Sequence, residues 1–139
     1  MTKQERVGIC ESFLVSEGYR PEKDNDGDLV FKSEGHLFAI LLEEGDEQFC
    51  RVVFPNFWAV ENQEEMTRAI VAAQEATSGT KVAKVFFIEN NAWAGVELFC
   101  TSPEQFTAVL ERSIGAIKAA VQTFVDTMRA AQKVHPSQN

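Results

Sequence analysis

The acidic stretch EKDNDGD, which begins at Glu22, holds the residue types closest to a site for chemistry. Alternating carboxylates around a glycine are typical of a calcium-binding loop. On that template Glu22, Asp24 and Asp26 take the first three ligand positions, and Gly27 takes the place of the glycine. The bidentate glutamate that should end the loop is missing, because Ser33 holds that place.

A turn accounts for the same acidic residues without a metal ion. Asp and Gly tolerate positive φ, so the pair Asp26-Gly27 favours the turn of a β-hairpin. Residues 29–34 then read as a strand, whereas a helix leaves a calcium loop. We therefore predict a hairpin between short strands at 19–23 and 29–34 and no bound metal, with a weak calcium site as the alternative.

The sequence gives little support for catalysis. His36 is expected in a turn and His135 in the tail, so neither pairs locally with a nucleophile. Cys10, Cys50 and Cys100 are far apart and lack the spacing of a zinc site, which favours buried reduced thiols. Glycine-rich nucleotide-binding motifs are also missing. We expect a protein that is not an enzyme and that has no cofactor.

Composition excludes some partners. The chain has 139 residues and a net charge of −8, from 13 Lys and Arg and 21 Asp and Glu. Nucleic-acid binding needs a basic surface, and an acidic protein is repelled by phosphate backbones and by anionic lipid. The longest apolar run, LFAILL, is too short to span a bilayer, and the N-terminus does not resemble a signal peptide. We expect a cytoplasmic protein that binds neither nucleic acid nor membrane.

Periodicity predicts the elements that position these residues. Helices are expected after caps at Thr2, Asn62 and Ser102; the first ends at Gly18, the second at Gly79 and the last near residue 133. Strands are expected over the following ranges: 29–34, 35–44, 48–54, 82–89 and 93–100. Pro55 should close the third of these, and Asn90-Asn91-Ala92 should join the last two in a hairpin.

This order of elements predicts an α+β fold, because strands in hairpins favour an antiparallel sheet. We expect five or six strands with three helices packed on them, in one domain over residues 1–134. Residues 135–139 are predicted to form a flexible tail.

Aromatic residues in unusual places are candidates for protein binding. Phe57 and Trp58 fall in a predicted connection between strand and helix, where large aromatic side chains are not expected to be exposed. They either cap the edge of the core or form a binding spot for another protein. Trp93, at the start of a predicted strand, has the same two interpretations.

The long last helix offers a candidate dimer contact. Its apolar residues follow a 4, 3, 4 spacing that forms a continuous stripe, made up of Ile117, Val121, Phe124 and Met128. Such a helix is longer than a small sheet needs to cover it. We expect a homodimer in which a second copy buries this stripe; the alternative is that the stripe is ordinary core.

Three runs carry a family resemblance: GYRPEKDNDGDLVFKSEG, RVVFPNFWAVEN and KVAKVFFIENNAWAGVELF. Over nearly the whole chain, the sequence resembles the YbjN-like bacterial proteins, which are labelled sensory transduction regulators. That resemblance implies a fold similar to type III secretion chaperones, in the order α-β-β-β-α-β-β-α. It supplies no catalytic residue.

The resemblance implies a non-catalytic protein-binding module, chaperone- or adaptor-like, with a partner or client of unknown identity. A small-molecule-sensing regulatory domain is the alternative, and it would need a pocket lined by Phe and Trp with a few polar groups. An uncatalogued enzyme is the third hypothesis.

Overall fold

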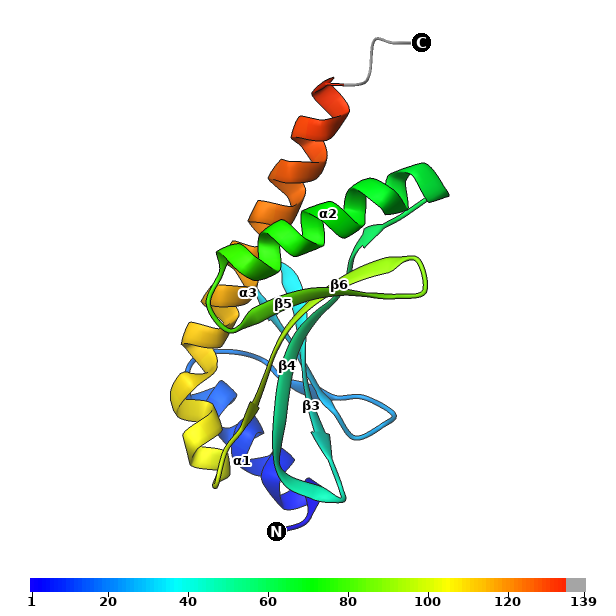
Figure 1. Ribbon diagram of the computed structural model, residues 1–139. Coiled ribbons are helices and arrows are strands. Elements are labelled where there is room, and N and C mark those ends of the chain that lie inside the picture. The colour runs from blue at the N-terminus through cyan, green and yellow to red at the C-terminus, as the bar shows by residue number, and fades with distance from the viewer. Residues whose placement is uncertain (135–139) are drawn as a thin grey trace.

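The computed structural model describes residues 1–134 (Figure 1), so the predicted tail at 135–139 lies outside the described residues. The fold is α+β, as predicted, with three helices and a six-stranded antiparallel sheet. In chain order the elements are α1 (Lys3–Ser16), β1 (Glu22–Lys23), β2 (Leu29–Ser33), β3 (His36–Glu43), β4 (Asp46–Ala59), α2 (Gln63–Gly79), β5 (Ala83–Ile88), β6 (Asn91–Phe99) and α3 (Pro103–Val134).

The strands lie in the order β1-β2-β3-β4-β6-β5, and every neighbouring pair is antiparallel. The first four form a meander. α2 then carries the chain from β4 to the far edge, and β6 returns between β5 and β4. Alternation within each strand sends one set of side chains toward the helices, where they form a single apolar core. Figure 1 shows α3 running along the sheet, with α2 crossing it.

The helix starts follow the predicted caps. Thr2 Oγ1 accepts a hydrogen bond from the Glu5 N–H at 3.1 Å, and the Glu5 carboxylate accepts from the Thr2 N–H at 3.0 Å. Asn62 Oδ1 accepts from the Glu65 N–H at 2.8 Å. These side chains satisfy backbone N–H groups that have no partner within the first turn of a helix. The capping predictions for the first two helices are confirmed.

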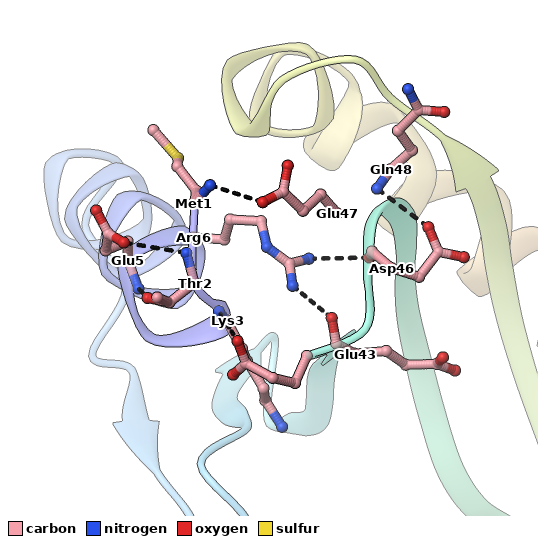
Figure 2. Close-up of polar contacts among 10 residues, drawn as sticks. Met1, Thr2, Lys3, Glu5, Arg6, Glu43, Asp46, Glu47 and Gln48 are labelled. Atoms are coloured by element: carbon pink, nitrogen blue, oxygen red, sulfur yellow. Dashed lines mark hydrogen bonds and ion pairs between the residues drawn. The ribbon is translucent and has the colours of Figure 1, made fainter.

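A buried arginine fastens α1 to the turn between β3 and β4 (Figure 2). Arg6 is 2% exposed, and its guanidinium donates to the backbone carbonyls of Glu43 and Asp46. The N-terminal amine of Met1 adds an ion pair with Glu47 at 2.7 Å. Charge-assisted hydrogen bonds offset much of the cost of burying the guanidinium, so the first helix is held in place by a polar contact as well as by the core.

Two predicted strand limits are wrong. β4 does not end at Pro55 but continues to Ala59, with a register shift between Phe54 and Trp58. A bulge explains this, because its extra residues need no ladder partner and Asn56 adopts a φ of 51°. The hairpin between β5 and β6 turns at Glu89-Asn90 and not at Asn90-Asn91-Ala92, because Ile88 already pairs with Asn91.

Candidate functional site

The acidic stretch forms the predicted hairpin turn. The Asp24 carboxylate accepts hydrogen bonds from the N–H groups of Asp26 and Asp28, both at 2.9 Å, and Gly27 adopts a φ of 79°. Lys3 forms an ion pair with Asp28 at 3.0 Å. Oxygens of Asp24, Asp26 and Asp28 lie within 4.8 Å of one another, but turn geometry and Lys3 already account for this arrangement. That no metal binds stays a prediction, and calcium titration with thermal unfolding tests it.

The three cysteines are free thiols buried in the core. Burial raises the pKa of Cys10 to about 12 and that of Cys50 to about 11, and it also raises the pKa of Cys100. The thiolate is the reactive form of cysteine, so these groups are poor nucleophiles near neutral pH.

Phe57 and Trp58 face the core at the end of β4. The Phe57 ring lies edge-on to Phe124 of α3, with centroids 5.2 Å apart, and the Trp58 ring lies 5.7 Å from the same residue. The Trp58 indole N–H donates to the Glu65 carboxylate at 3.0 Å. Both side chains are half-buried, so this part of the chain caps the core.

Trp93 lies on the other face of the sheet. Its neighbour Ala92 pairs with Trp58 and points into the core, so Trp93 points away from it. There its ring lies 6.3 Å from that of Phe86. The structure therefore does not bring Phe57, Trp58 and Trp93 together in one site.

The candidate dimer stripe on α3 faces inward. Ile117, Phe124 and Met128 are buried, and Val121 is half-buried against the same core. The stripe is therefore not left exposed, which favours ordinary core, while the homodimer itself stays a prediction. The expectation of an exposed stripe assumed that a small sheet could not cover so long a helix, but α2 packs on α3 as well.

A large apolar hollow in the described part of the chain is one that the sequence did not indicate. It has a volume of about 1070 Å³ and lies between the end of β6, the segment joining α2 to β5, and the first half of α3. We call it the β6–α3 groove. Its lining residues are Gly79, Thr80, Lys81, Val82, Leu98, Phe99, Cys100, Gln105, Ala108, Val109, Arg112, Ser113, Gly115, Ala116 and Ala119.

The groove exists because β6 is longer than its neighbour. The last β5–β6 pair is Ala83 with Val96, so the end of β6 has no strand beside it on that edge. The chain before β5 turns away, with Val82 at a φ of 58° and the Ala83 N–H bonded to the Lys81 carbonyl at 2.7 Å. A β-branched residue rarely adopts positive φ, and such strain is often found at functional sites.

Apolar side chains stand exposed around the groove. Val82 is 69% exposed and Val109 is 39% exposed. Phe99 is 77% exposed, but alternation along β6 directs its ring to the opposite face of the sheet, 5.9 Å from that of Phe49. On the α3 wall, small residues such as Ala108, Gly115 and Ala119 leave room for another chain to approach. Contiguous exposed apolar groups of this kind mark binding surfaces in soluble proteins.

The charged groups that line the groove are both cations, Lys81 and Arg112. Within residues 1–134, neither forms an ion pair, whereas the nearby Lys84 pairs with Glu97. The groove is therefore a locally positive feature of a protein whose net charge is −8.

Comparison with known proteins supports the fold and goes no further. No family model matches the sequence, and no curated protein matches it. The structure is similar to the crystal structure of an uncharacterized protein from Methanothermobacter thermautotrophicus, with a TM-score of 0.53 and 16% identity, covering 92% of this chain and 97% of that chain. Identity at this level shows a shared fold.

Among the helices of residues 1–134, none combines the length and the apolar character needed to cross a bilayer.

Proposed function

We propose that the protein is a non-catalytic protein-binding module, chaperone- or adaptor-like, that receives an apolar segment of a partner in the β6–α3 groove. The observation that carries this proposal is the exposure of Val82 and Val109 around one apolar hollow. Its resemblance to the YbjN-like proteins, whose label is regulatory, is compatible with such a role.

The energy available at this site is sufficient for binding. Full burial of an exposed Phe or Val side chain contributes about 1.5–3 kcal/mol. Interfaces commonly draw most of their affinity from a few such anchors near the centre of the contact. Val82 offers one anchor on the wall before β5, and Val109 offers a second on α3.

The alternative of a small-molecule sensor has less support. Sites for small ligands enclose most of the ligand and place a few polar groups inside an apolar pocket. The sensor hypothesis called for a lining of Phe and Trp, but among residues 1–134 the groove lining contains Phe99 alone of these types, and its ring points to the opposite face of the sheet. Cys100 also lines it, and its raised pKa makes it a poor catalytic nucleophile.

Capture of partners from a lysate of the organism that makes the protein tests the proposal. Three baits are compared: the natural chain, Val109→Glu in the groove, and Val71→Glu as a matched control. Val71 is an exposed valine on α2, 58% accessible and outside the groove. We expect one recurrent partner with the natural chain and the control, reduced at least tenfold with Val109→Glu.

Equal capture by the groove variant and the control variant would contradict the proposal. If no protein distinguishes Val109→Glu from Val71→Glu when both are folded by circular dichroism, the groove is not the binding site. A co-purifying small molecule lost with Val109→Glu would favour the sensor instead.

A further inference from the structure

We propose that the partner enters the groove as an extended strand that pairs with the free edge of β6 at Phe99 and presents acidic side chains to Lys81 and Arg112. This inference rests on the proposed function, because it names the kind of segment that the groove binds.

The hydrogen bonds of β6 show which of its backbone N–H and C=O groups are free to pair with a partner's strand. The Cys100 N–H donates to the Gln48 carbonyl at 2.8 Å, and the Asn90 carbonyl accepts from the Val60 N–H at 2.7 Å. The backbone N–H and C=O groups of even-numbered residues therefore point toward β4 at both ends of β6. The register shift between the two strands lies in β4, so it does not interrupt the alternation along β6. Residues alternate in direction along a strand, so the N–H and C=O of Phe99 face the groove.

Within residues 1–134, no strand of the chain itself pairs with this edge. Continued antiparallel pairing would place Thr80 opposite Phe99, as extrapolated from the pair Ala83 with Val96. The turn at Val82 takes the chain away instead, and Lys81 and Val82 become the far wall of the hollow. An open strand edge beside an apolar floor is the arrangement that binds an added strand, since main-chain hydrogen bonds give affinity and alternate side chains enter pockets.

The length of the groove fits a short segment. Its α3 wall runs from Gln105 to Ala119, which spans about 21 Å at about 1.5 Å per residue. A strand rises about 3.3 Å per residue, so about six residues of a partner would fill it. Two or three of their side chains would point at the apolar floor.

Charge complementarity selects an acidic segment. Lys81 and Arg112 lack ion-pair partners within residues 1–134, and both line the groove. Acidic residues of a partner docked in the groove are attracted by these cations, whereas basic residues are repelled. The net charge of −8 on each molecule also disfavours a second copy as the occupant.

A displayed library of random nine-residue peptides, selected on the full-length protein, tests this inference. We expect selected peptides with apolar residues at alternate positions and with Asp or Glu between them. Methylating their backbone nitrogens one at a time should weaken binding at every second position, because only those N–H groups face β6. Lys81→Glu and Arg112→Glu should each weaken binding at least tenfold, and Arg129→Glu, an exposed α3 cation outside the groove, less than twofold.

The outcomes separate this inference from the proposed function. Some selected peptides could bind the natural chain and lose binding to Val109→Glu, yet have apolar residues three and four apart or a basic consensus. That result would refute the acidic strand and keep the groove as a protein-binding site. A natural chain that doubles its mass in light scattering, and loses this with Val109→Glu, would identify a second copy as the occupant. If no selected peptide is sensitive to Val109→Glu, both proposals fail.

Discussion

Trp58 donates its indole N–H to the carboxylate of Glu65 at 3.0 Å, across the junction of β4 and α2. The other oxygen of that carboxylate accepts from the Glu61 N–H at 2.8 Å, while the Glu65 N–H is bonded to Asn62. One side chain therefore fixes the helix start and the tryptophan that covers Phe124. This is why an aromatic residue near a strand end serves the core here.

Replacing this carboxylate should destabilise the domain. Glu65→Ala leaves the Trp58 N–H and the Glu61 N–H without their partner, and we expect a loss of about 1–2 kcal/mol in the free energy of unfolding. Glu64→Ala is the matched control, since the Glu64 side chain is largely exposed and pairs only with Arg68 on the surface. It should change stability by less than about 0.5 kcal/mol. Urea unfolding measures both, and equal losses would contradict the role of Glu65.

The inward stripe of α3 makes a different prediction. Phe124 is fully buried among Phe57, Trp58 and Phe87, so Phe124→Ala should cost about 3–5 kcal/mol. Val121→Lys should also lower stability, because Val121 packs on the same core. Neither change should alter the mass measured by light scattering. A halved mass with unchanged stability would restore the stripe as a dimer contact.

The turn at Val82 should be a site where stability can be gained. Val82 has a φ of 58°, a conformation that costs a β-branched residue about 1–2 kcal/mol and that Asn tolerates better. We expect Val82→Asn to raise the free energy of unfolding by about 1 kcal/mol. Val71→Asn, in the regular backbone of α2, should give no gain. Thermal unfolding that shows no difference between the two variants would argue against strain at this turn.

The buried thiols predict a loss of stability at alkaline pH. A thiol with a raised pKa stays protonated in the folded protein while the unfolded chain releases its proton above about pH 8.5. The free energy of unfolding should therefore fall as pH rises from that value toward about 12, the pKa of Cys10. Cys10→Ala should show a smaller fall between about pH 8 and 11. Parallel curves for the two proteins would mean that Cys10 does not contribute to the pH dependence.

Much of the fold could be predicted from local patterns. The caps at Thr2 and Asn62, the turn at Gly27 and the alternation within the strands each depend on residues close together in the sequence. The limits of β4 could not be predicted in this way. A proline usually ends a strand, but Pro55 lies beside a bulge that only the pairing of β4 with β6 reveals.

The site was harder to predict than the fold. Val82 and Phe99 read as ordinary strand residues, since their exposure depends on where β5 stops beside β6. The stripe on α3 was misread because the packing of α2 on that helix is a contact between elements distant in the sequence. The two predicted strands, 82–89 and 93–100, are equally long, so their pattern did not indicate that the end of β6 would lack a neighbouring strand.

Photocrosslinking in the native lysate tests the groove most directly. A photoreactive benzophenone amino acid replaces Val109 in one sample and Val71 in another, both exposed valines on helices. We expect illumination to join one distinct partner protein to position 109 and not to position 71, and we expect Val82→Asp to abolish the adduct. No adduct at position 109, or the same adducts at both positions, would contradict this expectation.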